Sequence, residues 1–238
     1  MNIIQPYARL MNFEHGVQTC FTREDGIDLL CKIEWAARIS HRSEESQAPD
    51  SWRRFIQAVV MDRGDWSVVE HASATVDAVV DRGITQEWVR HRLFSFTQES
   101  TRFVNYEKKM PASFIEPPGL DDEADRAPNG EQTTLSSRQY WRHAIYTAES
   151  AYKSLIREGV PPQIARSVFP NSLSSRIVTT GNLRNWRHFF LMRTSKEAHP
   201  QMRQVTIPLL EEFKTNIPLL YDDIIPMSRQ VDNMRLPR

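Results

Sequence analysis

The chain has 238 residues, of which 40% are hydrophobic and 25% are charged, a composition typical of a globular protein with its own core. Its 30 basic residues balance 30 acidic ones, so it lacks the broad positive surface of a general nucleic-acid-binding protein. The two cysteines, Cys20 and Cys31, are too few for a disulfide scaffold or a four-cysteine zinc site, so we expect reduced thiols and no bound metal. We see no signal peptide and no membrane-spanning run, and we expect a cytoplasmic protein.

The first third of the chain alternates extended and helical patterns. Residues 1–22 can contain strand, and apolar residues recur at helical spacing over 27–38 and again over 51–62. Residues 72–80 alternate apolar and polar side chains, with Asp77 on the polar side, which predicts a half-buried strand. A short helix over 84–89 then leads into a cationic segment.

That segment, residues 90–102, carries arginines, a histidine and hydroxyls between aromatic side chains. If the preceding helix continues, Glu87, His91 and Ser95 share one face at i, i+4 spacing, and Arg90 and Arg92 extend to either side. An isolated Arg-His-Arg triplet is more often a solvated helix end. The hydroxyls that follow favour an anion site instead.

Beyond the triplet the helical period is lost. We expect Ser100 and Arg102 on the same side of an extended segment. Guanidinium groups and hydroxyls together can donate to several phosphate oxygens at once, so the segment predicts a phosphate site.

Residues 110–137 are rich in Pro, Asp, Glu, Gly, Ser and Thr without apolar periodicity, and we predict a long exposed loop there. Its acidic residues lack the spacing of a calcium loop, so we interpret them as a solvated tip; they are Asp121, Asp122, Glu123 and Asp125. An amphipathic helix over 137–158, a short helix after Pro161 and a strand over 177–181 follow, and residues 205–225 are predicted to contain a C-terminal helix.

A second candidate segment spans residues 181–193, where Asn182 is a good N-cap for a helix. Its predicted buried stripe contains Trp186, Phe189 and Phe190. Arg193 falls on the same stripe, where a cation is costly unless it meets an anion or a carbonyl, so it is either a helix-end cation or a site residue. Arg184 and His188 share the opposite face.

Several segments resemble, in the same order, those of the flavin-dependent thymidylate synthases. The segments are Ala-Ala-Arg-Ile-Ser at 36–40, Arg-His-Arg at 90–92 with Ser-x-Arg at 100–102, Gly-Val-Pro with Ala-Arg across 159–166, and Gly-Asn-x-Arg at 181–184, which leads into an aromatic helix ending in Arg193. The resemblance implies one α+β domain over residues 1–238, with an antiparallel sheet packed against several helices.

The resemblance implies reductive methylation of dUMP to dTMP. In the family, 5,10-methylenetetrahydrofolate gives the carbon, FAD passes the hydride and NADPH reduces the flavin, and four chains assemble as a homotetramer with shared flavin pockets. Neither Cys20 nor Cys31 lies in a setting that marks an activated nucleophile, which agrees with a family that needs no cysteine attack.

By the same resemblance, the FAD-binding residues are Ser67, Glu70, His71, Arg90, His91, Arg92, Gln98, Asn182, Arg184 and His188, with Ser40 as a further candidate. The dUMP-binding residues are Glu87, Arg90, Gln98, Ser100, Thr101, Arg102, Arg166 and Arg193, and Arg193 is the catalytic candidate against the uracil ring. His199 matches a recurrent histidine only if one residue is inserted before it. Many members have Gln at the position of Glu87 and Asn-Glu at the position of Thr97-Gln98.

Two other classes of protein fit parts of the pattern. A non-catalytic nucleotide-binding module would keep the phosphate site without the chemistry. An RNA-binding protein would use the arginines for backbone contacts and the aromatic residues for stacking, although the balanced overall charge argues against it.

Overall fold

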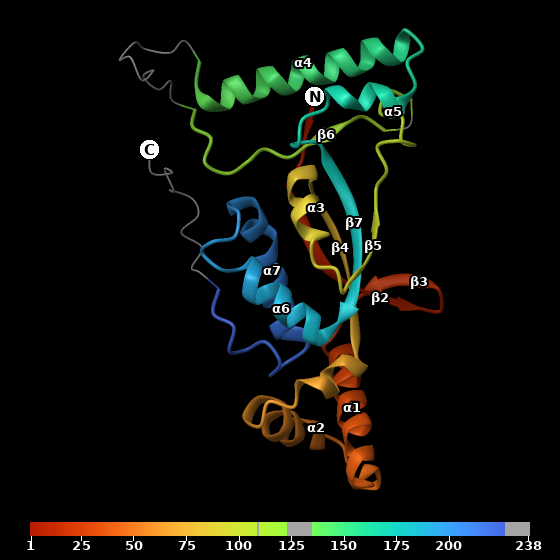
Figure 1. Ribbon diagram of the computed structural model, residues 1–238, viewed down its shortest axis with the longest axis vertical. Helices are drawn as coiled ribbons and strands as arrows, with labels where there is room; N and C mark the ends of the chain where they lie inside the picture. The colour runs from red at the N-terminus through yellow and green to blue at the C-terminus, as the bar shows by residue number, and fades with distance from the viewer. Residues whose placement is uncertain (109, 123–134, 227–238) are drawn as a thin grey trace.

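The computed structural model describes residues 1–108, 110–122 and 135–226, which are built around a five-stranded sheet (Figure 1). Neighbouring strands in the order β3-β2-β4-β7-β5 all run antiparallel, which confirms the predicted sheet. The strands are β2 (Tyr7–Glu14), β3 (Val17–Cys20), β4 (Ser73–Asp81), β5 (Ser95–Gln98) and β7 (Ser174–Asn182). A parallel pair, β1 (Asn2–Ile3) with β6 (Ser113–Phe114), was not predicted.

The central strand β4 has the predicted alternation on its core face. The apolar residues there are all buried: Ala74, Val76, Ala78 and Val80. The polar face differs from the prediction, because Asp77 is fully buried. Its carboxylate accepts from Arg176 Nε at 2.6 Å, from Arg9 at 3.3 Å and from the Tyr7 hydroxyl at 3.2 Å, so neighbouring strands cover it with paired charges.

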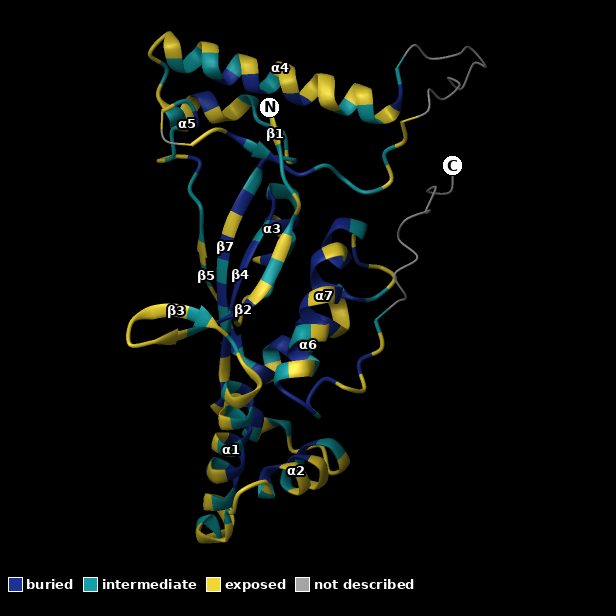
Figure 2. Ribbon diagram, turned by 180° about the vertical axis from the view of Figure 1, so that it is seen from behind, coloured by how far each residue is buried: buried dark blue, intermediate teal, exposed yellow. Residues whose placement is uncertain are grey.

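Helices α6 (Leu183–Arg193) and α7 (Pro200–Asn216) lie on one side of the sheet, and α1 (Arg23–Arg38) continues from its lower end (Figures 1 and 2). The aromatic stripe predicted for α6 is confirmed, since its three rings are fully buried. The helix predicted over 27–38 starts earlier, because Thr22 and Asp25 form a capping box. Pro200 opens α7, so that helix starts before the predicted range of 205–225. It also ends within that range, at Asn216.

The helix predicted over 51–62 is present, but its hydrogen bonding changes along its length. It runs as α2 (Ser51–Phe55) and then as a π-helical stretch (Ile56–Asp62). Trp52, Ile56 and Val60 form its fully buried stripe. Apolar spacing therefore gave the buried face correctly and could not distinguish the two kinds of helix.

A second hydrophobic cluster lies beneath α4 (Ser137–Arg157), beside α5 (Pro162–Ala165) and a 3-10 turn (Arg166–Val168). It corrects the exposed loop predicted over 110–137, because Ala112, Phe114 and Ile115 are buried and β6 pairs with β1. Asp121 and Asp122 are exposed, as predicted for a solvated tip. Glu123 and Asp125 lie outside the described residues.

Helix α3 (Arg82–Trp88) begins at Asp81, whose carboxylate accepts from the Ile84 amide. It ends before His91, so Ser95 does not share a helix face with Glu87 and lies in β5 instead. The extended segment predicted at 100–102 is also wrong, because the amides of Phe103 and Val104 both donate to the Ser100 carbonyl and close a turn. No helix within the described ranges is both long enough and apolar enough to cross a membrane.

Candidate active site

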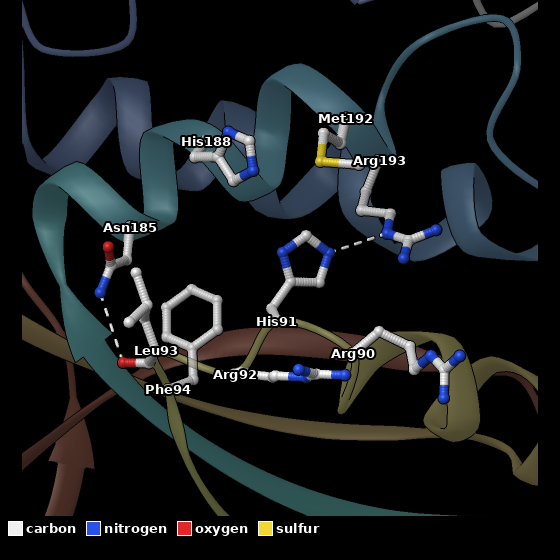
Figure 3. A pocket seen from close by; sticks show the side chains of 9 residues that line it. All are labelled: Arg90, His91, Arg92, Leu93, Phe94, Asn185, His188, Met192 and Arg193. Carbon is white, nitrogen blue, oxygen red and sulfur yellow. Dashed lines mark hydrogen bonds between the residues drawn. The ribbon is translucent and has the colours of Figure 1, made fainter.

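A pocket of about 300 Å³ lies between the segment that follows α3 and helix α6 (Figure 3). All its lining residues come from the two segments singled out in the sequence: Arg90, His91, Arg92, Leu93 and Phe94 from the first, and Asn185, His188, Met192 and Arg193 from the second. The lining has three arginines, two histidines and no acidic residue. It therefore suits an anionic ligand.

Local turns and close packing hold the first segment against α6. The amide of Phe94 donates to the His91 carbonyl at 3.2 Å, which turns the Phe94 ring into the core, 4.6 Å from the ring of Trp186. Asn182 caps α6 by accepting from the Asn185 amide, and the Asn185 side chain donates to the Leu93 carbonyl at 3.3 Å. The side chain of Asn185, at the capped start of α6, thus joins both walls of the pocket.

Arg193 is held by three hydrogen bonds at the end of α6. Its Nε donates to His91 Nε2 at 2.9 Å, and its two terminal nitrogens donate to the Glu87 side chain at 2.9 Å and to the Glu87 carbonyl at 3.0 Å. The Arg193 side chain is only 16% exposed. The cation on the apolar stripe therefore meets both a carboxylate and a carbonyl, as its position requires.

His91 is neutral in this arrangement. A guanidinium can only donate, so His91 Nε2 must accept and carries no proton. Burial, followed by the charges of Arg193 and His188, lowers the pKa of His91 to about 4. The ring also packs edge-on against Phe189, with centroids 4.9 Å apart.

Two of the predicted phosphate residues, Arg102 and Arg166, belong to a second group beside α5, whereas Arg90 lines the pocket at α6. Arg166 donates to the Thr101 hydroxyl at 3.0 Å, and Arg102 Nε donates to Gln163 at 3.1 Å. This group lies at one end of β7, whereas α6 begins at the other end (Figure 1). Within one chain, Arg102 and Arg166 therefore come together, but apart from the pocket at Arg193.

The remaining flavin candidates lie around these two groups. Glu70 and Arg184 form an ion pair at 2.6 Å, with 46% and 50% of their side chains exposed. Ser67 and His71 are exposed on the same 3-10 turn as Glu70 (Trp66–His71). Gln98 donates inward to Thr85 and Ser175, at 2.9 and 3.0 Å.

Ser40 and His199 have local structural partners. The Ser40 hydroxyl donates to the Ala37 carbonyl at the end of α1, and His199 caps α7 by accepting from the Gln201 amide. Gln163 was not predicted, although it stands three residues before Arg166 on the same short helical segment. In the described ranges, no cluster of three or more His, Cys, Asp or Glu side chains could hold a metal ion.

Fold and site together define a single α+β domain with an arginine-rich pocket between α6 and the segment that follows α3. The family described as thymidylate synthase complementing protein matches residues 29–219. A flavin-dependent thymidylate synthase of Mycobacteroides abscessus is 33% identical over 201 residues, which cover 80% of this chain and 78% of that protein. The enzyme of the same name from Mycobacterium tuberculosis H37Rv is 30% identical over 198 residues, with the same coverage. The chain belongs to this family of flavin-dependent methyltransferases.

A solved structure shares the fold. The crystal structure of a UMP/dUMP methylase, PolB from Streptomyces cacaoi, bound with 5-Br dUMP, superposes with a TM-score of 0.64 at 24% sequence identity. The match covers 90% of this chain and 91% of that one. The single-domain α+β fold implied by the sequence resemblance is thereby confirmed.

Proposed function

We propose that this protein is an FAD-dependent thymidylate synthase that methylates dUMP to dTMP, with 5,10-methylenetetrahydrofolate as carbon donor and NADPH as reductant of the flavin. One observation carries the proposal beyond family membership: Arg193 is fixed at the wall of a pocket that also holds Arg90 and Arg92, beside the rings of His91 and His188. This is the environment that a nucleotide with an electron-rich pyrimidine needs.

Arg193 would act on the uracil ring. Of the five N–H groups of its guanidinium, three are used in bonds to Glu87 and His91, so five minus three leaves two for a ligand. A fixed cation beside the ring would stabilise the enolate-like negative charge that makes a pyrimidine carbon nucleophilic toward the one-carbon donor. Arg193 is therefore the catalytic residue of the proposal.

The nucleotide would be held by the full set implied by the sequence: Glu87, Arg90, Gln98, Ser100, Thr101, Arg102, Arg166 and Arg193. In one chain these residues form two groups, at α6 and beside α5. We propose that a homotetramer brings the groups of different chains together, so that each site draws on several subunits.

The same assembly would complete the FAD site. A pocket of about 300 Å³ is at the lower limit for small-molecule sites, so a dinucleotide needs further walls. The proposed contacts are Ser67, Glu70, His71, Arg90, His91, Arg92, Gln98, Asn182, Arg184 and His188, whose cations, hydroxyls and amides suit a pyrophosphate. When bound and reduced, the flavin supplies the hydride.

The unpaired thiols of Cys20 and Cys31 support a cytoplasmic location.

An absorbance spectrum of the purified protein tests this function, followed by addition of NADPH with and without dUMP. Flavin bleaching that dUMP accelerates, with formation of dTMP when methylenetetrahydrofolate is added, is the expected result. Colourless protein that cannot be reconstituted with FAD would contradict the proposal and favour a nucleotide-binding module. Strongly salt-dependent RNA affinity without flavin would indicate an RNA-binding protein.

A further inference from the structure

All three acceptors of Arg193 come from outside α6, from α3 and the residues that directly follow it. Glu87 supplies two of them, its carboxylate and its backbone carbonyl, and His91 supplies the third (Figure 3 shows the bond to His91). The Glu87 carbonyl lies in the last turn of α3, where it accepts from Arg193 and also from the Arg90 amide at 3.3 Å.

We propose that Glu87 is a positioning residue for Arg193. Its carboxylate and backbone carbonyl together fix the plane of the guanidinium, and neutral His91 accepts a hydrogen bond from Nε of Arg193. The inference rests on the proposed function, in which Arg193 contacts the uracil ring. It assigns Glu87 a role that acts through Arg193.

The charges around Arg193 explain why a carboxylate is needed. Its charged or titratable neighbours in the pocket are Arg90, Arg92, His91 and His188, and none of them is negative. Without the Glu87 carboxylate, a mostly buried guanidinium would share the pocket with two other arginines and have no counter-charge there. Arginine has several rotatable bonds, so it would then turn toward solvent and lose the orientation that a planar ligand requires.

His91 supports the same geometry only while it is neutral, because an imidazolium has no lone pair to accept from Arg193. Its ring is held in place by the edge-on contact with Phe189, and His188 of α6 lies 6.1 Å away between ring centroids. Glu87 and His91 therefore contribute differently. Glu87 supplies the counter-charge, and His91 supplies a rigid acceptor.

Three variants test the role of Glu87. Glu87→Ala removes the acceptor, Glu87→Gln keeps an oxygen acceptor without the charge, and Gln86→Ala is a matched control, since Gln86 is exposed on the same helix. With flavin content held equal, we expect Glu87→Ala to lower kcat/KM for dUMP on the order of 100-fold, through both a lower kcat and a higher KM. Glu87→Gln should lose about tenfold or less, and Gln86→Ala should stay within about twofold.

A second measurement does not depend on turnover. In protein labelled with 15N-arginine, the Arg193 Nε–H signal, assigned through Arg193→Lys, should exchange slowly with solvent in the wild type. Exchange should be at least about tenfold faster in Glu87→Ala and in His91→Phe, which keeps an aromatic ring but removes the acceptor. The His91 variant gives this readout even if Glu87→Ala does not fold.

Two results would overturn the positioning role. One is a Glu87→Ala enzyme with kcat/KM within about twofold of the wild type; the other is an Arg193 Nε–H that exchanges as slowly in Glu87→Ala as in the wild type although kcat/KM falls, which would assign the loss to something other than the orientation of Arg193. If the wild type forms no dTMP, the proposed function fails, and Arg193 exchange then decides the inference separately. Equal exchange in the wild type, Glu87→Ala and His91→Phe would refute it.

Discussion

Replacing Gly181 with alanine tests how tightly the strand before α6 supports the pocket. A Cβ at Gly181 would lie 1.9 Å from Phe94 Cδ1 and 2.1 Å from Phe94 Cε1. Ordinary contact begins at 3.4 Å, so the ring would have to move by 3.4 minus 1.9, or 1.5 Å. Phe94 cannot move freely, because it is 8% exposed and packs against Trp186 at 4.6 Å between ring centroids.

Overpacking of this kind costs roughly 1–3 kcal/mol, and a collision this deep belongs at the upper end. Alanine restricts the unfolded chain, which offsets about 0.4–1 kcal/mol. We therefore expect the free energy of unfolding to fall by about 2 kcal/mol, and Tm to fall by roughly 4–8 °C.

Urea unfolding at one fixed protein concentration measures the effect in the wild type, Gly181→Ala, Phe94→Leu and the double variant. Leucine lacks the ring that the new methyl group would meet, so the loss caused by Gly181→Ala should shrink by at least about 1 kcal/mol in the Phe94→Leu background. The reasoning is refuted by a Gly181→Ala protein within about 0.5 kcal/mol of the wild type, or by the same loss in both backgrounds.

Three further changes address the site and the sheet. Arg193→Ala should lower dTMP formation by at least about 100-fold while FAD still binds, and near-normal turnover would remove Arg193 from the mechanism. An NMR titration should find the pKa of His91 at about 4, below its ordinary 6.5. Its contribution to stability, up to roughly 3 kcal/mol, is then complete above pH 6.5 and is lost as the pH falls toward 4; a pKa near 6.5 would contradict this. Asp77→Asn should cost about 1–3 kcal/mol in urea unfolding, because half-exposed Arg176 and Arg9 lose a buried charge partner, and unchanged stability would show that the cluster contributes nothing.

The periodicity of apolar side chains correctly predicted which faces of the strands and helices are buried. The alternation in β4 and the aromatic stripe of α6 follow directly from which faces meet the core. The burial of Asp77 could not be read in the same way, because its partners Arg9 and Arg176 lie 68 and 99 residues away in the chain. Only the strand register brings these charges together.

The same limit applies to the site. The motifs indicated both His91 and Arg193, but their contact spans 102 residues, and no local pattern encodes it. The turn after Ser100 and the burial of Phe114 were missed for a related reason, since each depends on backbone bonds rather than on composition. The family resemblance gave the expected roles of the residues. The structure showed which of these residues lie together within one chain.

The proposed nucleotide site combines the pocket at Arg193 with the group of residues at Arg166. Within one chain these two groups of residues lie apart. Co-expressing Arg193→Ala and Arg166→Ala chains with different tags, and purifying the mixed oligomers, tests this most directly. If each site takes these arginines from different chains, random mixing at equal amounts makes about a quarter of the sites intact, and dTMP formation recovers to about that fraction of the wild type. Mixed oligomers that bind FAD but recover no activity would contradict a site shared between subunits.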